Sequence, residues 1–396
     1  MKENIEVTIN KYRLVRRIKW VLYYLFRPFI QFENMFYCHK KNKIQRLFCT
    51  TGNISLINAL AIIKEIENYD KYDDILIIDS NKGEDSFMKK QLEIAKIHKF
   101  KKILASARIN PGVQCVLNNL WCVDEIYIVN HPLHLNTVLP LYKNAEVNLI
   151  DEGVASLINY GLDKITNLRK IKTHKYLDKL DFMGIDDINK YNFETVDVEK
   201  FKQVANYLSK QYPINVEYNK EDKYVLYCGI YWEVTGLSRE KFIQIQSDML
   251  NELLNAGYKI LYKPHPRDNE YFGFDKNPNV IFIDSKYPIE LYYLDIVAIV
   301  SVSSTSSITY SHYWGVPGVS NIVEESLKED KNDIANINIV RYILQEYSLN
   351  YKELLEFNTS SISKEDLKSK LKDLYNKYID NKPLLSENKY IRSNIE

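Results

Sequence analysis

The sequence lacks the short motifs that mark most metal and dinucleotide sites. Its 396 residues contain no Asp-x-Asp motif, no cluster of His and Cys at zinc-site spacing, no GxGxxG fingerprint and no P-loop. Its five cysteines are odd in number and form no CxxC pair, which disfavours a disulfide framework. We therefore expect reduced thiols and no requirement for a metal or a resident cofactor.

The sequence also lacks an excess of charge of either sign and a long apolar run. Lys and Arg number 53 against 52 Asp and Glu, so a nucleic-acid-binding surface along the whole chain is not indicated. The apolar stretch from Trp20 to Phe32 is interrupted by Arg27 and Pro28 and is too short to span a bilayer. The residues before it are charged and lack the apolar core of a signal peptide. A cytoplasmic location is expected.

Basic residues surround this apolar stretch. They are Arg13, Arg16, Arg17, Lys19 and Arg27, set among tryptophan and tyrosine. Such a segment suits peripheral contact with an anionic membrane surface, here the cytoplasmic face of an inner membrane. It equally suits a helix packed on the N-terminal domain. The sequence leaves both interpretations open.

Segments with few charges and many β-branched or aromatic residues alternate with helical patterns along most of the chain. Such segments are typical of buried strands in parallel sheets. We expect strands at residues 46–51, 74–79, 102–106, 125–130 and 146–151, and again at 223–229, 258–263, 279–284 and 295–302. The alternation predicts an α/β fold with two Rossmann-like domains, each a parallel sheet with helices on both faces.

The predicted domain boundaries follow from these two series of strands. Residues 1–44 form an N-terminal basic and aromatic segment, 45–195 the first Rossmann-like domain, 196–340 the second, and 341–396 a C-terminal helical segment. Connector and accessory helices are expected between about 160 and 220, where the periodicity weakens. Ligands of open α/β sheets bind at the carboxyl ends of strands, so the residues after each strand are the candidates for a site.

An acidic pair follows the last strand of the first domain. Asp151 and Glu152 precede Gly153, which lets the backbone turn sharply. A carboxylate within hydrogen-bond reach of a hydroxyl group can take its proton as the hydroxyl attacks. The same pattern is also a common turn. His131 and His134, after the preceding strand, could reach the same cleft as this acidic pair, but we interpret them as structural.

A basic turn stiffened by proline follows the strand at 258–263. Its sequence is Lys263-Pro264-His265-Pro266-Arg267, and the two prolines restrict the backbone around the imidazole. A positioned histidine with lysine and arginine nearby can bind a phosphate and stabilise the charge that develops on it. The turn therefore predicts a phosphate contact.

Hydroxyl side chains follow the strand at 295–302. Ser303, Ser304 and Thr305 precede a helical pattern, and hydroxyls with free N–H groups at a helix N-terminus form an anion site. Ser and Thr are also ordinary N-caps. Glu290 lies between this run and His265, and is either a partner of a helix dipole or an acceptor for ribose hydroxyls.

Together these motifs resemble those of bacterial sialyltransferases of GT-B type, which include lipooligosaccharide sialyltransferases and capsule polysialyltransferases. Those families share a D/E-D/E-G motif in the first domain, an HP motif in the second and a Ser/Thr pair after a later strand. The matching residues here are Asp151-Glu152-Gly153, His265-Pro266 and a pair within Ser303–Thr305, over roughly residues 45–320. The resemblance implies two Rossmann-like domains that face a central cleft, with 45–195 on the acceptor side.

The resemblance also implies a reaction. Asp151 or Glu152, with Asp151 favoured, would deprotonate the acceptor hydroxyl. His265 would bind the phosphate of CMP-sialic acid and act as acid or electrostatic stabiliser. The sialyl group would then move in one inverting displacement, without metal, to a glycan or glycolipid acceptor such as a surface polysaccharide or lipooligosaccharide.

Further nucleotide contacts are implied in the second domain by the same resemblance. Glu290 falls where similar enzymes contact the ribose, and Gly229 lets the nucleotide approach the backbone. The Ser304 and Thr305 hydroxyls would hold the phosphate, with a register uncertain by one residue. The residues assigned to the donor site are Gly229, Lys263, Pro266, Glu290, Ser303, Ser304 and Thr305.

Other functions are compatible with part of the pattern. Teichoic acid glycerophosphotransferases, which use CDP-glycerol, also combine an HP turn with a Ser pair. Transfer of another CMP-linked sugar acid, such as Kdo, is a further alternative that lies between sialyl transfer and the CDP-glycerol reaction. The acidic pair before glycine favours sialyl transfer. A non-catalytic membrane-surface protein is the alternative from a different class. The acceptor, the linkage and the oligomeric state stay open.

Overall fold

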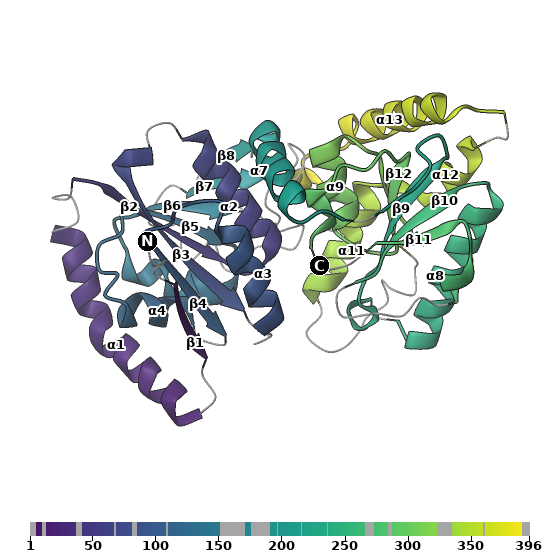
Figure 1. Ribbon diagram of the computed structural model, residues 1–396. Coiled ribbons are helices and arrows are strands. Elements are labelled where there is room, and N and C mark those ends of the chain that lie inside the picture. Colours follow the sequence, from purple (N-terminus) through teal and green to yellow (C-terminus); the bar gives the residue numbers. More distant parts are fainter. Residues whose placement is uncertain are drawn as a thin grey trace. The chain divides into compact units, whose positions relative to one another are not determined.

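The computed structural model describes residues 5–9, 13–36, 42–66, 69–80, 85–107, 110–150, 171–175, 191–195, 197–214, 216–235, 237–265, 273–283, 287–322, 335–358 and 361–389. They form two compact units, and the division falls inside helix α7 (Val198–Gln211), between Val204 and Ala205. Each unit is a parallel β-sheet with helices on both faces (Figure 1). The predicted α/β fold with two parallel-sheet domains is confirmed.

The first unit contains an eight-stranded sheet in the order β1-β4-β3-β2-β5-β6-β7-β8. Its strands are β1 (Ile5–Ile9), β2 (Ile44–Thr50), β3 (Tyr72–Ser80), β4 (Lys102–Ala107), β5 (Glu125–Val129), β6 (Glu146–Ile150), β7 (Ile171–Lys175) and β8 (Tyr191–Thr195). Its helices are α1 (Arg13–Phe36), α2 (Asn53–Glu65), α3 (Asp85–Ala95), α4 (Pro111–Leu117) and α5 (Pro132–Thr137). The strand order reverses between β2 and β5, which is the topological switch point of this sheet.

The second unit repeats this design with six strands in the order β11-β10-β9-β12-β13-β14. Its strands are β9 (Tyr224–Cys228), β10 (Lys259–Lys263), β11 (Val280–Phe282), β12 (Ala298–Ser301), β13 (Gly318–Ser320) and β14 (Leu349–Asn350). Its helices are α8 (Arg239–Asn255), α9 (Ser306–Trp314), α11 (Ala335–Glu346), α12 (Tyr351–Phe357) and α13 (Lys364–Asp380). The strand order is that of a dinucleotide-binding fold, with its switch point between β9 and β12.

Burial explains why the central strands read as continuous apolar runs. All five residues of β9 and all four of β12 are buried, because helices cover both faces of the sheet and leave no solvent-facing side. The four cysteines that the structure describes, Cys49, Cys115, Cys122 and Cys228, are free and buried. This agrees with the expectation of reduced thiols.

Several strands lie where the sequence indicated none. β7 and β8 fall in the region predicted to be connector and accessory helices, and extend the first sheet beyond β6. Their sequences, IKTHK and YNFET, contain too few apolar residues for a buried-strand signal, and backbone pairing with the sheet determines their conformation. The prediction was wrong for these two segments, whereas α7 is a helix within the same region, as predicted. In the same way, β14 joins the second sheet within a stretch predicted to be wholly helical.

The N-terminal residues belong to the first unit. β1 pairs in parallel with β4 at the edge of the sheet. Helix α1 packs against α4 and the 3₁₀ helix Leu139–Leu141. The Tyr23 hydroxyl donates to the Thr137 carbonyl oxygen at 2.9 Å, and Gln31 Nε2 donates to the Pro140 carbonyl oxygen at 2.6 Å. One face of α1 is therefore attached to this unit, as one of the two sequence interpretations predicted.

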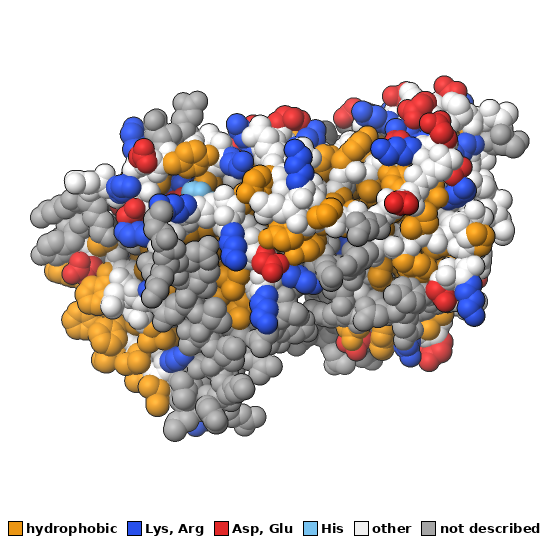
Figure 2. Space-filling model, in the orientation of Figure 1, with side chains coloured by type: hydrophobic (Ala, Val, Ile, Leu, Met, Phe, Trp, Pro, Cys, Tyr) orange, Lys and Arg blue, Asp and Glu red, His pale blue; other side chains and the backbone are white. Residues whose placement is uncertain are grey.

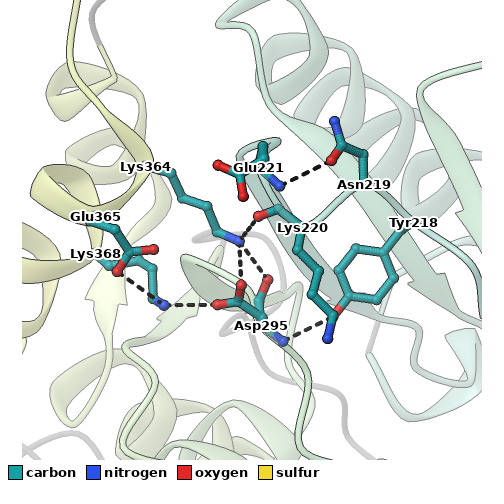
Figure 3. Close-up of polar contacts among 8 residues, drawn as sticks. All are labelled: Tyr218, Asn219, Lys220, Glu221, Asp295, Lys364, Glu365 and Lys368. Atoms are coloured by element: carbon teal, nitrogen blue, oxygen red, sulfur yellow. Dashed lines mark hydrogen bonds and ion pairs between the residues drawn. The ribbon is translucent and has the colours of Figure 1, made fainter.

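The C-terminal helix α13 is attached to the second unit by ion pairs. Lys364 and Lys368 donate from Nζ to the two carboxylate oxygens of Asp295 at 2.7 and 2.8 Å (Figure 3). Lys364 also donates to the carbonyl oxygen of Lys220, and the Asp295 amide donates to the Tyr218 hydroxyl at 2.9 Å. Asp295 lies just before β12, so α13 supports the strand that leads to the candidate site.

A buried ion pair joins β2 to β3 in the first unit. Arg46 is fully buried and donates from Nε and Nη2 to the two carboxylate oxygens of Asp74, at 2.6 and 2.7 Å. His98 Nε2 lies 2.8 Å from the same carboxylate. Burial acts to raise the pKa of Asp74, but the hydrogen bonds with His98 and Arg46 outweigh it, and the pKa lies below its ordinary value.

Asp74→Ala is expected to lower the free energy of unfolding by about 3–5 kcal/mol, because it leaves a guanidinium buried without its partner. Since folding lowers the pKa of Asp74, the wild-type contribution is complete above the unfolded-state pKa and is lost as pH falls through the folded-state pKa. Urea denaturation of this variant and of the matched control Asp73→Ala measures the effect. Asp73 is half-exposed and pairs with Lys101, so its loss should cost under about 1 kcal/mol; equal losses would contradict the prediction.

Candidate functional site

The carboxyl ends of β9, β10 and β12 lie at one edge of the second sheet. In the register of the parallel strands, Lys263 is opposite Cys228 and Val300 is opposite Tyr227. β9 and β12 flank the switch point, where an open α/β sheet binds its ligands. The residues that follow these strands therefore form the candidate site, which lies wholly within the second unit.

The turn after β10 packs against Gly229, the residue that follows β9. The Gly229 amide donates to the Lys263 carbonyl oxygen at 2.9 Å. A Cβ at Gly229 would lie 3.1 Å from the His265 nitrogen and 3.3 Å from the Lys263 oxygen. Because Gly229 has no side chain, the backbone after β9 can lie close to the backbone of the turn after β10. The sequence did not indicate this reason for the glycine.

His265 is half-buried in this turn. The ring of Tyr231, from the loop after β9, stacks on the imidazole with 6.0 Å between the ring centroids and 24° between the planes. Burial, and secondarily the charge of Lys263, lower the pKa of His265 to about 4. At neutral pH the imidazole is therefore uncharged in the free protein. It can donate one N–H to a phosphate oxygen, and a bound anion would raise its pKa.

Two charged side chains are buried beside this turn. Lys263 ends β10 with 8% of its surface exposed, and Glu290 lies in a short 3₁₀ helix with 4% exposed. Both charges act on the Cys228 thiol: its pKa is raised to about 12, mainly by burial and secondarily by Glu290, while Lys263 acts to lower it. The Thr309 hydroxyl donates to Glu290 Oε1 at 2.7 Å. The Glu290 carboxylate is thereby held next to helix α9.

The hydroxyl run after β12 divides into two roles. Ser304 builds the turn, because its amide donates to Ser301 Oγ at 3.1 Å and its Oγ accepts from the Ser306 amide at 3.3 Å. Ser303 is buried, and its Oγ has no hydrogen-bond partner among the described residues. Thr305 is the N-cap of α9, but its side chain makes no capping bond. Ser303 and Thr305 are thus the hydroxyls that the turn itself does not use.

Helix α9 rests on β13 through a close backbone contact. A Cβ at Gly318 would lie 2.1 Å from the carbonyl oxygen of Ser307, in the first turn of the helix. A side chain at this position requires movement of the helix start, and with it movement of the hydroxyl run.

Gly318→Ala is therefore expected to lower the free energy of unfolding by about 1–3 kcal/mol, the usual range for overpacking. It should also weaken binding of the ligand held by the hydroxyl run. Urea denaturation and nucleotide titration measure the two effects. Unchanged stability together with unchanged binding would show that the contact tolerates a methyl group.

Some predicted site residues lie outside the described part of the chain. These are Asp151, Glu152 and Pro266. β6 ends at Ile150, so the acidic pair follows directly after a strand of the first sheet, as the sequence predicted. Their side-chain positions carry no argument below.

Two polar side chains are buried near the ends of β3 and β5 in the first unit. His134 Nε2 lies 3.6 Å from Asp79 Oδ2, and both residues are almost fully buried. Within the described ranges, neither side chain has a hydrogen-bond partner for any of its nitrogen or oxygen atoms. His131 begins α5, with Nδ1 accepting from the Leu133 amide at 3.3 Å. His131 is thus the N-cap of α5, and His134 lies in the interior of the unit beside Asp79.

Sequence reasoning missed the residues that support the candidate site. Tyr231 stacks on His265, and Thr309 holds Glu290. Signals for both were present: Tyr231 lies two residues beyond Gly229 in a switch-point loop, and Thr309 lies one helical turn after Thr305. Asp79 lies one residue before the end of β3, and no motif in the neighbouring sequence indicated that it would be buried beside His134.

Comparison with known protein families decides which of the candidate interpretations applies. Residues 35–323, most of the chain, match the model of the alpha-2,8-polysialyltransferase (POLYST) family. The chain belongs to this family. It is therefore a glycosyltransferase, and the matched range contains the whole candidate site of this polysialyltransferase-family protein. A search of curated protein sequences gave no significant match.

Solved structures with a similar fold include three enzymes. The sialyltransferase of Photobacterium damsela is 13% identical, with 78% of this chain and 81% of that chain covered at a TM-score of 0.46. The UDP-GlcNAc 2-epimerase of Neisseria meningitidis, bound to UDP-GlcNAc, is 14% identical, with 86% and 100% covered at 0.49. The wall teichoic acid polymerase TagF is 10% identical, with 97% and 96% covered at 0.49. Their activities differ, so these similarities do not distinguish among functions.

Proposed function

We propose that this polysialyltransferase-family protein transfers sialic acid from CMP-sialic acid to a hydroxyl group of a glycan acceptor, in a surface polysaccharide or a lipooligosaccharide. The observation that carries the proposal is the polar edge of the second sheet. There a half-buried histidine, a buried lysine, a buried glutamate and a buried hydroxyl that has no hydrogen-bond partner among the described residues collect at the switch point. The family match covers all of them.

The donor would be held by its nucleotide at this edge. The His265 N–H would donate to a phosphate oxygen, and the Ser303 and Thr305 hydroxyls would donate to the same group at the start of α9. Lys263 supplies positive charge nearby. Glu290, fixed by Thr309, would accept hydrogen bonds from the ribose hydroxyls.

The transfer would be a single displacement. The acceptor oxygen forms a bond to the anomeric carbon of the sialyl group from the side opposite the phosphate, so the configuration inverts. The bond from that carbon to the phosphate oxygen breaks, and CMP leaves with the electron pair. Asp151 or Glu152 takes the proton of the acceptor hydroxyl. The charge that develops on CMP is stabilised by protein groups, and we propose that no metal and no resident cofactor take part.

Product analysis tests this proposal. The purified protein is incubated with CMP-sialic acid and a panel of lactosides and sialosides, and the products are examined by mass spectrometry. We expect at least one acceptor to gain one or more sialyl residues, in chelator-treated buffer as in untreated buffer. Transfer of glycerophosphate from CDP-glycerol to acceptors, with no sialylated product, would contradict the proposal.

The affinity for the donor is expected to rise as pH falls. In the free protein the pKa of His265 is about 4, and a bound phosphate raises it, so the complex takes up protons as it forms below the bound-state pKa. Linkage then predicts up to about tenfold tighter binding per pH unit in that range. Calorimetric titration from pH 5 to 8 measures this pH dependence of the affinity. The ligand is a non-transferable CMP-sugar analogue, whose phosphodiester does not titrate in that range. The same pH dependence in His265→Ala would contradict the assignment.

The proposed place of action is the cytoplasm, at the inner face of the membrane where surface glycans are assembled. None of the helices in the described ranges is long and apolar enough to cross a bilayer.

A further inference from the structure

Helix α1 (Arg13–Phe36) exposes a continuous apolar face. Five large apolar side chains of this helix, Ile18, Val21, Leu25, Phe29 and Phe32, have 51% to 65% of their surface accessible, and Tyr24 beside them has 62%. Their spacing of three and four residues places them on one side of the helix. Figure 2 shows hydrophobic side chains gathered over this helix. A stripe of this length exceeds the scattered apolar residues of an ordinary surface.

The opposite face of α1 explains why the stripe points outward. Tyr23 and Ile30 are buried in the core of the first unit, and Trp20 packs against the same core. The hydrogen bonds of Tyr23 and Gln31 to the segment 137–140 hold this orientation. The helix therefore has two apolar sides: the core covers one, and the other is open to solvent.

The charges of α1 indicate what covers the open side. The helix carries five basic residues, Arg13, Arg16, Arg17, Lys19 and Arg27, and one acidic residue, Glu33. Arg17 is exposed beside the apolar stripe. Apolar and aromatic side chains on one face with basic residues alongside are typical of helices that lie in the interface of an anionic bilayer. A protein partner with a neutral apolar groove would gain nothing from this excess of positive charge.

We propose that α1 lies flat on the surface of an anionic phospholipid bilayer and inserts the stripe formed by Ile18, Val21, Leu25, Phe29 and Phe32 among the lipids. The helix is joined rigidly to the first unit, so the membrane contact holds that unit at the bilayer surface. Leu25 and Phe29 lie at the centre of the stripe and Arg17 near its N-terminal end. The inference does not depend on the transfer reaction, because none of these residues belongs to the candidate site.

Sedimentation with lipid vesicles tests the proposal. The full-length protein is mixed with vesicles of phosphatidylglycerol and phosphatidylethanolamine, and with vesicles of phosphatidylcholine alone. We expect binding to the anionic vesicles that weakens with salt, and much weaker binding to the neutral ones. Leu25→Glu combined with Phe29→Glu should lower the partition coefficient by about 100-fold or more, since each buried side chain contributes about tenfold or more. Arg17→Gln should lower it about fivefold.

A matched control separates the stripe from a general effect of added charge. Tyr207 on α7 is an exposed aromatic residue that belongs to the second unit and not to the stripe, and Tyr207→Glu should leave vesicle binding unchanged. Transfer to a small water-soluble acceptor should stay at the wild-type level in all these variants. Equal vesicle binding by the wild type and the stripe variant would overturn the proposal. So would a wild-type dimer, seen by light scattering, that the stripe variant converts to monomer, because the stripe would then cover a second copy.

Discussion

His265→Ala is expected to lower kcat for sialyl transfer by about 10²–10⁴, the usual contribution of a positioned proton donor. In the structure the imidazole is half-buried at the end of β10, stacked on Tyr231, and uncharged at neutral pH because its pKa is about 4. It would act first as an N–H donor to the phosphate, and would gain charge only as CMP departs. Steady-state kinetics with CMP-sialic acid at saturating acceptor measure the loss.

His265→Gln distinguishes hydrogen bonding from proton transfer at the same position. The glutamine amide can donate an N–H but cannot transfer a proton to the leaving group. We expect this variant to bind the donor analogue more tightly than His265→Ala while its kcat stays low. Both variants should retain the wild-type free energy of unfolding within about 1 kcal/mol, because the substituted side chain is half-exposed and away from the core. Wild-type turnover in His265→Ala would exclude a catalytic role.

Substitution of the acidic pair after β6 is expected to have an effect of similar size on one of its two members. Asp151→Asn and Glu152→Gln each remove a proton acceptor while they keep the side-chain volume. The variant that has lost the base should show a kcat lower by about 10²–10⁴, and the other should stay near the wild-type value. Each serves as the control for the other, and kcat for both is measured with one acceptor.

The pH dependence of kcat shows whether a lower kcat results from loss of the general base. In the wild type, kcat should fall at low pH as the general base becomes protonated, and the variant without this base should lack that fall. Affinity for the CMP-sugar analogue should be unchanged in both variants, since the nucleotide contacts come from the second unit. Near-normal turnover in both variants would remove the acidic pair from the mechanism.

The central strands could be predicted from sequence because their burial leaves a continuous apolar signal. β9 and β12, buried along their whole length, were found within a few residues. β7 and β8 were missed because the ladder bonds of a sheet depend on the backbone, and a strand with alternating polar residues pairs as well as an apolar one. Local sequence carries no information on such pairing.

Residues at the candidate site were predictable where chain direction alone determines their position. Lys263 is the last residue of a strand, and His265 and Ser303 follow strands. Parallel strands bring their carboxyl ends to one edge of the sheet. Contacts between side chains from different segments were not predictable in this way. The stacking of Tyr231 on His265 depends on how the loop after β9 crosses the turn after β10, which no local pattern encodes. The hydrogen bonds of Ser304 to Ser301 and Ser306, which hold Ser304 within its own turn, likewise could not be predicted from the sequence.

The most direct test of the account is turnover of the two candidate donors by the same purified protein. CMP-sialic acid and CDP-glycerol are each supplied with an acceptor mixture, and release of the nucleotide is followed over time, with His265→Ala as the control. We expect release of CMP from CMP-sialic acid, a rate at least about 100-fold lower in the variant, and no turnover of CDP-glycerol. Release from CDP-glycerol alone, or a rate that does not depend on His265, would contradict the account.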